Sequence, residues 1–238
     1  MYKTPAETVS FFEKFRPLVA DVTHAEIVIC PPFVNLPAAA AGSEGTRIQI
    51  GAQNMFWAAE GAFTGEVSAG MLRATGCQWV IVAHSERREY FGETEATALK
   101  KVGAALKAGL TPIYCVGEQL QEREGNKTHQ VLQRQLQGCV GQLTPEQFRG
   151  LVIAYEPCWA IGTGKVATPE IAADAHAFIR SEIREYFGNE AADGCRILYG
   201  GSVKPDNVSG LMAQDEIDGA LVGGASLDPA SFAAIVNF

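Results

Sequence analysis

The strongest constraint on this sequence is a repeated alternation of short apolar runs with longer helical patterns. The apolar runs are rich in β-branched residues and nearly continuous in hydrophobicity, which is typical of strands buried on both faces of a parallel sheet. The runs predicted to be strands are Glu26–Cys30, Ile48–Gln53, Trp79–Ala83, Thr111–Val116, Leu151–Tyr155, Arg196–Tyr199 and Gly219–Val222. Because strand and helix alternate at about 30 residues per unit, the pattern predicts right-handed βαβ units.

Helical patterns occupy the segments around these strands. The first helix is expected over Thr4–Ala20, where a threonine cap is followed by proline and by a capping-box glutamate. Its apolar residues Val9, Phe12, Phe15 and Leu18 predict one buried face. Further helices are predicted at Ser68–Thr75, Glu95–Ala108, Glu118–Gly138, Pro169–Phe187, Pro205–Met212 and Pro229–Val236.

Seven such strands allow either an open doubly wound sheet or a closed barrel, and the polar residues distinguish the two. An open sheet would concentrate functional groups at one switch point, whereas a (β/α)8 barrel gathers them at the carboxyl ends of all its strands. Polar or glycine residues follow nearly every predicted strand, as in Gln53-Asn54, His84-Ser85-Glu86, Glu118, Glu156, Gly200-Gly201-Ser202 and Gly223-Gly224. The sequence therefore predicts an α/β fold of the (β/α)8-barrel type, with residues 1–238 in one domain.

Composition and charge exclude several classes of function. The chain has 238 residues, 47% of them hydrophobic and 19% charged, which is typical of a globular domain with a large core. A net charge of −8 argues against a nucleic-acid partner. The sequence shows no membrane span and no signal peptide, so a cytoplasmic location and no membrane partner are expected. The six cysteines contain no CxxC pair, so we expect reduced thiols and no metal site.

Two glycine-rich words near the end of the chain indicate an anion site. "GGSVKPDN" (200–207) and "LVGGASL" (221–227) each follow a predicted strand and lead into a helix. Their backbone N–H groups, together with the hydroxyl of Ser202, can hold a phosphate without any net positive charge. The alternative is that Gly200-Gly201 and Gly223-Gly224 only make tight turns. Two such turns in succession favour phosphate, which in barrels commonly binds at this place.

His84 is a candidate electrophile in "VAHSERREYFGE". It ends an apolar strand and precedes a predicted helical turn, whose positive end would favour a neutral imidazole. A neutral ring can donate one hydrogen bond to a carbonyl oxygen. The alternative is a structural histidine. Glu86 is expected to support His84, to form an ion pair with Arg88, or to do both.

Glu156 is a candidate general base in "YEPCWAIGTGKVATPE" (155–170). A carboxylate at a strand end can be desolvated, which makes it a better base, although a surface turn is the alternative. In the segment that follows, Pro157 and Trp159 predict a rigid part and Gly162-Thr163-Gly164 a flexible part. This combination is expected for a hinged lid that excludes water. A glutamate base, a histidine electrophile, a phosphate site and a lid together fit proton abstraction next to a carbonyl.

The whole chain resembles the triosephosphate isomerase family. The matching words are "GAQN" (51–54), "GAFTGEVS" (61–68), "AHSERR" (83–88), "PIYCVGE" (112–118), "YEPCWAIGTGK" (155–165), "LYGGSVKPDN" (198–207) and "GALVGGASL" (219–227). The resemblance implies a TIM barrel that interconverts dihydroxyacetone phosphate and glyceraldehyde 3-phosphate without a cofactor. A phosphorylated triose is the implied substrate, and glycolysis and gluconeogenesis are the implied pathways.

The resemblance also assigns roles to individual residues. It implies that Glu156 is the base and that His84 is the electrophile, a pairing that is the established pattern of this family. Glu86 and Cys115 fall on supporting positions. The residues that fall where the family binds phosphate through backbone N–H groups are Gly162, Ser202, Gly223 and Gly224. The loop carrying Phe63 and Thr64 matches the loop with which the family forms homodimers.

The sequence departs from the family pattern at two places. Cys158 stands in the lid hinge where many relatives carry an aliphatic residue, and a small thiol should be tolerated there. The family's first strand, which ends in an Asn-x-Lys word, has no counterpart ahead of Met1. We therefore expect seven strands, a barrel with a seam, a weakened dimer and impaired turnover. The alternative is a non-catalytic remnant that binds a phosphorylated ligand or a partner protein.

Overall fold

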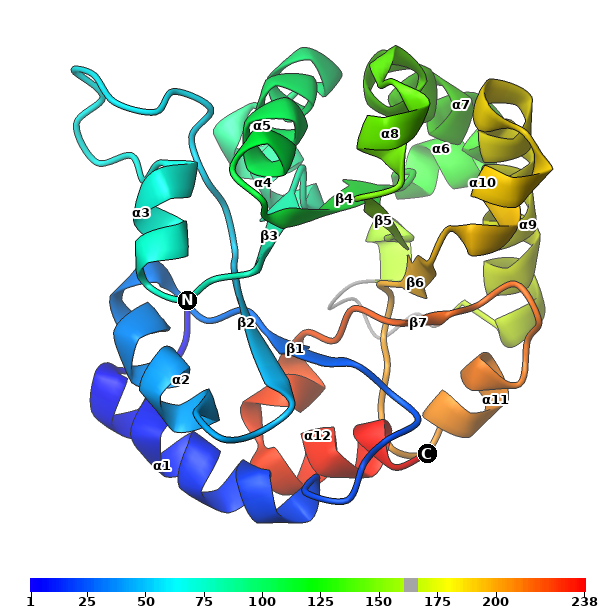
Figure 1. Cartoon of the computed structure of the whole chain (residues 1–238). Helices are drawn as coiled ribbons and strands as arrows, with labels where there is room; N and C mark the ends of the chain where they lie inside the picture. The colour runs from blue at the N-terminus through cyan, green and yellow to red at the C-terminus, as the bar shows by residue number, and fades with distance from the viewer. Residues whose placement is uncertain (161–166) are drawn as a thin grey trace.

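The computed structural model describes residues 1–160 and 167–238. In this part of the chain, seven parallel strands form one curled sheet in the order β1-β2-β3-β4-β5-β6-β7 (Figure 1). The strands are β1 Ile27–Ile29, β2 Ile48–Ala52, β3 Trp79–Val82, β4 Thr111–Val116, β5 Val152–Tyr155, β6 Ile197–Tyr199 and β7 Gly219–Ala220. Each strand pairs with the next one along the chain, so the predicted seven-stranded barrel-type fold is confirmed.

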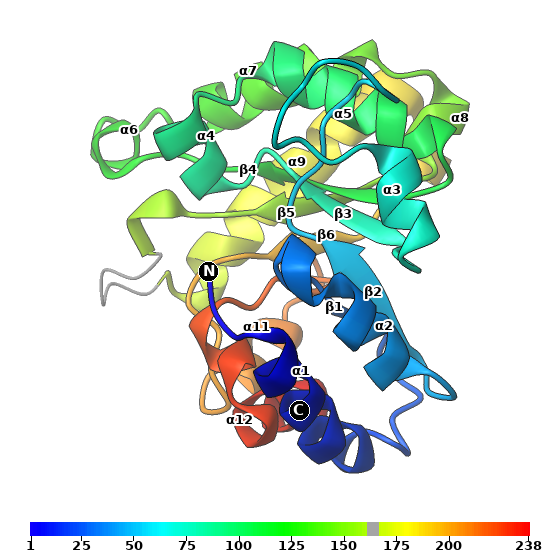
Figure 2. The same ribbon diagram turned by 90° about the vertical axis from the view of Figure 1, so that its left-hand side faces the viewer.

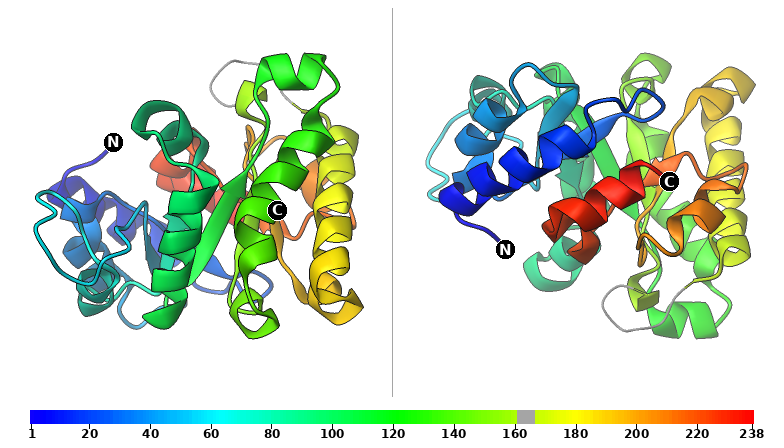
Figure 3. Two further views of the ribbon diagram at one scale, coloured as in Figure 1. Left: turned by 90° about the horizontal axis from the view of Figure 1, so that it is seen from above. Right: turned by 90° about the horizontal axis from the view of Figure 1, so that it is seen from below.

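The helices surround the sheet (Figures 1 and 3). The α-helices are α1 Pro5–Phe15, α2 Leu36–Ser43, α3 Ala69–Ala74, α4 Ser85–Phe91, α5 Glu95–Lys107, α6 Leu120–Glu124, α7 Thr128–Cys139, α8 Pro145–Phe148, α9 Pro169–Phe187, α10 Asn189–Gly194, α11 Val208–Met212 and α12 Pro229–Val236. Short 3-10 turns lie at Arg16–Leu18, Phe33–Asn35, Val140–Gln142, Cys158–Ala160 and Gly224–Leu227. Figure 2 shows α5, α7 and α9 together on one side of the molecule and α1 and α12 on the other.

Side chains alternate strictly between the two faces of the sheet. On β3, β4 and β5, one set of residues packs inward as a small central cluster of Trp79, Ile81, Ile113, Cys115, Val152 and Ala154. Their neighbours along the strands, such as Val80, Tyr114 and Ile153, belong to the larger core beneath the helices. Because both faces are buried, these strands lack the polar alternation of a half-exposed sheet.

One predicted helix is wrong in its extent. The segment Glu118–Gly138 forms two helices, α6 and α7, which are separated at Gly125–Lys127. Asn126 lies in this break with a φ of 53°, a left-handed conformation that interrupts a helix and that asparagine tolerates better than most residues. Residues 121–130 contain no apolar side chain, so the apolar pattern carried no information about the interruption.

The first helix begins where expected, but α1 ends at Phe15, before the predicted Ala20, and buries a different face. Thr4 caps α1 with a complete capping box. Phe12 and Phe15 are buried as predicted, whereas Val9 and Leu18 are about half exposed. The buried face packs on α2 and α12, and the Phe15 ring stacks on that of Phe232 at 5.1 Å between centroids. Helices from the two ends of the chain therefore lie side by side (Figure 3).

The sheet has two edges in the described residues, because β1 pairs only with β2 and β7 only with β6. Near the amino ends of the strands, Arg196 Nη1 donates a hydrogen bond to Glu26 Oε2 and so links the start of β6 to the start of β1. The curl of the sheet and this ion pair bring distant strands together. The carboxyl ends of the strands are consequently grouped at one end of the fold, which is where the barrel prediction placed the functional residues.

His176 of α9 is a completely buried histidine. Its Nδ1–H donates to the carbonyl of Glu216 at 3.1 Å, and its Nε2 is buried without a hydrogen-bond partner among the described residues. Burial lowers the pKa of His176 to about 4, because a charged ring would be poorly solvated there. The folded chain therefore keeps this ring neutral. Its contribution to stability is complete only at pH values where the unfolded chain also keeps the ring neutral.

This pKa predicts a stability loss in acid. Above about pH 6.5, the ordinary value for histidine, the contribution is complete. As the pH falls from 6.5 toward 4, the unfolded chain takes up a proton that the folded chain does not, so the free energy of unfolding should fall by about 3 kcal/mol from this group. Urea titrations from pH 7 to 4 should show a shallower loss in His176→Gln than in the parent chain.

The exposed His129 provides the matched control. His129→Gln removes a half-exposed ring and leaves His176 in place, so the loss of stability in acid should persist in this variant. Parallel curves for the parent and His176→Gln would contradict the assignment.

Candidate active site

His84 stands at the junction between β3 and α4. It is the N-cap residue of α4, and its Nδ1 accepts the backbone N–H of Glu86 at 3.3 Å. Its Nε2 lies 2.9 Å from Oε1 of Glu156. A nitrogen that accepts an N–H carries no proton, so we assign a neutral ring whose Nε2–H points to the carboxylate.

Glu156 follows β5 directly, and its side chain is 2% exposed. Besides His84, it accepts two hydrogen bonds from Ser85. The Ser85 N–H lies 2.9 Å from Oε2, and the Ser85 hydroxyl lies 3.2 Å from Oε1. The first turn of α4 therefore binds this carboxylate, which the positive end of a helix favours. The sequence placed Ser85 near His84 but did not predict that it would bind Glu156.

The charge of Glu156 acts on His84. Burial lowers the pKa of His84, but the hydrogen bond and negative charge of Glu156 outweigh burial, with smaller contributions from Glu86 and Glu93. The pKa of His84 is therefore raised above its ordinary value. A raised pKa favours the charged ring, whereas the sequence predicts a neutral imidazole. This effect lasts as long as Glu156 stays in contact with the ring.

Glycines on the two neighbouring strands make room for Glu156. A Cβ atom at Gly117, after β4, would stand 1.7 Å from the carbonyl oxygen of Glu156. A Cβ atom at Gly200, after β6, would stand 2.8 Å from Cγ of Glu156. These contacts are far below van der Waals distance, so only glycine fits at either position. The sequence indicates Gly200 only as part of an anion site and gives no sign of the role of Gly117.

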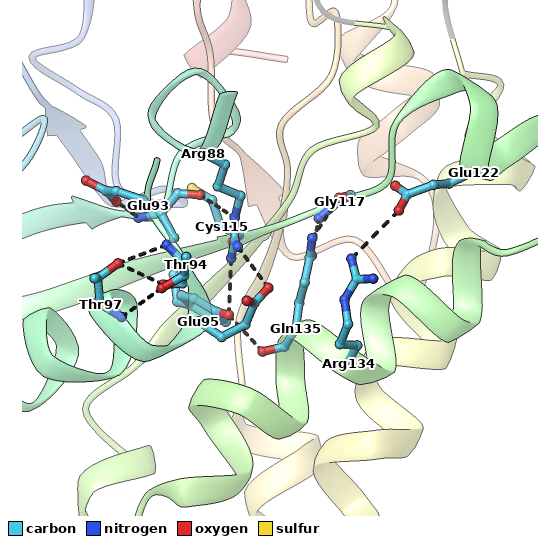
Figure 4. A network of polar contacts seen from close by, with 12 residues as sticks. Arg88, Glu93, Thr94, Glu95, Thr97, Cys115, Gly117, Glu122, Arg134 and Gln135 are labelled. Atoms are coloured by element: carbon cyan, nitrogen blue, oxygen red, sulfur yellow. Dashed lines mark hydrogen bonds and ion pairs between the residues drawn. The ribbon is translucent and has the colours of Figure 1, made fainter. Parts of the chain in front are cut away.

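Glu86 has only a weak link to the site. Its carboxylate lies 3.9 Å from Nδ1 of His84, and its side chain is 67% exposed. The ion pair of Glu86 with Arg88, one of the two roles considered from the sequence, is wrong. Arg88 instead pairs with Glu95, at 3.1 Å between Nη1 and Oε1, and points toward β4 (Figure 4). What Glu86 brings to His84 in this structure is chiefly its backbone N–H.

The segment after Glu156 is anchored by a second buried carboxylate. Glu118 accepts hydrogen bonds from Trp159 Nε1 at 2.9 Å and from the hydroxyl of Tyr155 at 3.1 and 3.2 Å. The thiol of Cys158 lies 3.5 Å from the carbonyl of Glu156, and burial raises its pKa to about 12. Gly162, the lid residue predicted to bind phosphate, lies outside the described residues.

The structure places the other predicted phosphate residues at strand ends. Gly223 and Gly224 follow β7 at the start of a 3-10 turn, and a Cβ atom at either would meet nothing within 4 Å. Ser202 is partly exposed, and its carbonyl accepts a hydrogen bond from Asn207 Nδ2 at 2.9 Å. The word 200–207 does not open a helix directly, because α11 begins only after Asn207 has closed this turn.

The loop predicted to form a dimer contact runs from β2 to α3 and projects from the body of the molecule (Figure 1). Phe63 is 46% exposed, and its ring packs on that of Phe56 at 4.6 Å between centroids. Gly61 has a φ of 141°, which lets the chain fold back against the Phe63 ring. Thr64 is exposed at the tip. The loop thus presents an aromatic side chain to the outside.

The structure also bears on membrane partners and on metal binding. Within residues 1–160 and 167–238, no helix combines the length and apolar character that a membrane crossing requires. The same residues contain no group of three His, Cys, Asp or Glu side chains arranged to hold a metal ion. All six cysteines are free thiols.

The curled parallel sheet, with an imidazole and a buried carboxylate in contact at its carboxyl ends, defines an enzyme of the α/β-barrel class. The family model described as triosephosphate isomerase matches residues 1–238. The chain therefore belongs to the triosephosphate isomerase family.

Similar proteins support this assignment along the whole chain. A triosephosphate isomerase of Solibacter usitatus is 66% identical over 238 residues, which cover 100% of this chain and 96% of that protein. Those of Citrifermentans bemidjiense and Moorella thermoacetica are 57% and 53% identical, and each match covers 100% of this chain and 95% of the relative. The comparisons support an isomerase. They give no support to impaired turnover or to the alternative of a non-catalytic remnant.

Proposed function

We propose that this chain interconverts dihydroxyacetone phosphate and D-glyceraldehyde 3-phosphate, with Glu156 as the base. The observation that carries the proposal is the contact between the buried Glu156 carboxylate and the Nε2 of His84. A base and a hydrogen-bond donor at this spacing can act on adjacent atoms of one small substrate. Family membership supplies the identity of that substrate.

In the proposed reaction, Glu156 removes a proton from the carbon next to the carbonyl and returns it to the neighbouring carbon. His84 donates Nε2–H to the oxygen on which negative charge develops. The reaction exchanges no atoms or electrons with a cofactor, because the product is an isomer of the substrate.

Glu156 and His84 bind each other, so a substrate must replace this contact before either can act on it. Once the carboxylate turns from the ring, His84 loses the main cause of its raised pKa, and burial then favours the neutral imidazole.

The phosphate of the substrate is proposed to bind at Ser202, Gly223 and Gly224, with Gly162 closing from the lid. The open space at both glycines of the 223–224 pair supports this assignment, since a ligand could approach the backbone there. We further propose that residues 1–238 form a single domain, that the protein works in the cytoplasm, and that Phe63 and Thr64 contribute to a homodimer.

Glu156→Asp tests the base. The shorter side chain draws the carboxylate back by one methylene, and a misplacement of this size should lower kcat by about 10²-fold. Turnover is measured in both directions with purified triose phosphates. Glu89→Asp on exposed α4 is the matched control and should keep parent kinetics. Unchanged turnover in Glu156→Asp would show that another group is the base.

Gly224→Ala tests the phosphate site. Gly224 begins a 3-10 turn, a conformation that alanine also adopts, and the new methyl meets no protein atom within 4 Å, so the melting temperature should be unchanged. It would stand where the phosphate must approach, so KM for the triose phosphate should rise by about 10-fold or more, equivalent to at least 1.4 kcal/mol of binding. Gly103→Ala, which also faces open space, is the control. An unchanged KM would place the phosphate elsewhere.

Phe63→Ser tests the dimer contact. Removing an exposed aromatic anchor should weaken association, because such residues carry much of the binding energy of an interface. Sedimentation velocity at micromolar concentration should show a parent dimer and a shift toward monomer in the variant. Phe238→Ser removes an aromatic ring of similar exposure, 50%, and should leave the dimer intact. A parent monomer, or equal association of Phe63→Ser and the parent, would refute the proposal.

A further inference from the structure

The residue that links β3 to His84 has an unfavourable backbone conformation. Ala83 has a φ of 59°, and it shares positive φ with only two other non-glycine residues of the described chain, Lys3 and Asn126. The left-handed region brings Cβ close to the backbone, and alanine has no polar side chain with which to stabilise it. Ala83 is also completely buried. Contacts from other residues must therefore hold it in place.

Glu93 holds the N–H of Ala83. Its Oε2 accepts this N–H at 3.2 Å, while Oε1 accepts hydrogen bonds from Arg87 and Lys101. Lys101 in turn donates to Oδ1 of Asn54 at 2.7 Å. Burial raises the pKa of Glu93, but Lys101 and Arg87 lower it more, so the carboxylate stays ionised and keeps both oxygens as acceptors. One oxygen of Glu93 is thus left for the backbone of Ala83.

Arg88 holds the C=O of the same residue. Its Nε donates to the carbonyl of Ala83 at 3.0 Å. Its Nη2 donates to the carbonyl of Cys115 at 3.1 Å and to the hydroxyl of Tyr114 at 3.2 Å, and its Nη1 pairs with Glu95. Figure 4 shows Arg88 reaching between these groups, with Glu93 close by. The guanidinium therefore links the backbone carbonyl of Ala83 to strand β4 through hydrogen bonds.

The two contacts together determine where His84 points. The N–H belongs to the peptide group before Ala83, and the C=O belongs to the peptide group that joins Ala83 to His84. Fixing both planes fixes both backbone dihedral angles of Ala83, and hence the direction of the His84 side chain. We propose that Glu93 and Arg88 are positioning residues that hold Ala83 left-handed, so that Nε2 of His84 faces the reacting atoms. This inference rests on the proposed role of His84.

Glu93→Gln separates positioning from simple stabilisation. The amide has one acceptor oxygen, which Lys101 and Arg87 will bind, so its NH₂ group faces the N–H of Ala83 as donor against donor. We expect kcat to fall by about 10- to 100-fold with little change in KM, as for a small displacement of a catalytic group. In ¹⁵N-resolved spectra of the imidazole, the His84 Nε2 signal should shift, because its hydrogen bond to Glu156 is disturbed.

Lys101→Met is the control within the same cluster. It removes a partner of Oε1 but leaves Oε2 on the N–H of Ala83, with Arg87 still bound to the carboxylate. We expect a lower melting temperature with kcat and the His84 signal unchanged. If Lys101→Met and Glu93→Gln lower stability equally and neither moves the His84 signal, the cluster is only structural and the proposal fails.

The decisive test is rescue by glycine at position 83. Glycine adopts positive φ without steric cost, so it should need less support from Glu93. In the double variant Ala83→Gly, Glu93→Gln, the His84 signal should return toward its parent position and kcat should recover at least several-fold relative to Glu93→Gln alone. Failure of this rescue would overturn the proposal. If Glu93→Gln does not fold, Arg88→Lys, which keeps the charge but loses the fork of donors, is measured with alanine and with glycine at position 83.

The ¹⁵N signal of His84 tests this proposal independently of the proposed function. If His84→Gln retains full turnover, the role assigned to His84 is wrong, and the kinetic part of this test falls with it. The His84 signal in Glu93→Gln still decides whether Glu93 orients the ring, because that signal does not depend on turnover.

Discussion

The site depends on the continuation of the parallel hydrogen-bond ladder one residue beyond the end of β5. The N–H of Glu156 donates to the carbonyl of Val116 at 2.7 Å, and the N–H of Gly200 donates to the carbonyl of Tyr155 at 2.7 Å. Hydrogen bonds to the neighbouring strands therefore fix the backbone at Glu156 independently of its side-chain contacts. Strands packed this closely leave no room for a Cβ atom at Gly117 or Gly200, so the glycines follow from the ladder.

An acidic chain can bind an anionic substrate because the relevant fields are local. The net charge is −8, yet Glu156 is held by an N–H at the start of a helix, and the proposed phosphate site offers backbone N–H groups. Donors of this kind act within one turn of their helix or loop. The remaining surface charge can be negative without preventing phosphate binding, as long as it lies outside that range.

Much of the fold could be predicted because its strongest signals are local in sequence. β4 was predicted with its observed bounds, since it is a long apolar run bounded by turn residues, and so were α9 and α12, which begin with a cap followed by proline. α2 was missed because its alanine-rich sequence has almost no amphipathic pattern. β7 was predicted too long, because Leu221 and Val222 are apolar. The N–H of Leu221 still donates to the carbonyl of Tyr199 at 2.9 Å, whereas Val222 lies beyond the ladder with β6.

The candidate site was predictable in its chemistry but not in its contacts. His84 and Glu156 stand out as polar residues at strand ends, and the structure brings them together. The contact of Glu156 with Ser85 joins segments 71 residues apart, and the contact of Ala83 with Glu93 joins the turns before and after α4. No spacing rule in the sequence reports them. The positive φ of Ala83 is equally hidden, since alanine gives no sign of a left-handed conformation.

Two buried carboxylates on adjacent strand ends show how one residue type serves two purposes. Glu118, after β4, is completely buried and is bound by Tyr155, Trp159 and Thr128, which lie on a strand, a hinge turn and a helix. Among the described residues, the carboxylate of Glu156, after β5, accepts hydrogen bonds from His84 and Ser85, which are adjacent in the chain. Moving the Glu118 side chain would break contacts with three elements, whereas the hydrogen bonds of Glu156 with His84 and Ser85 involve one short segment at the start of α4. Glu118 therefore anchors the turn at Cys158–Ala160, and the fewer contacts of Glu156 support its proposed role as the base.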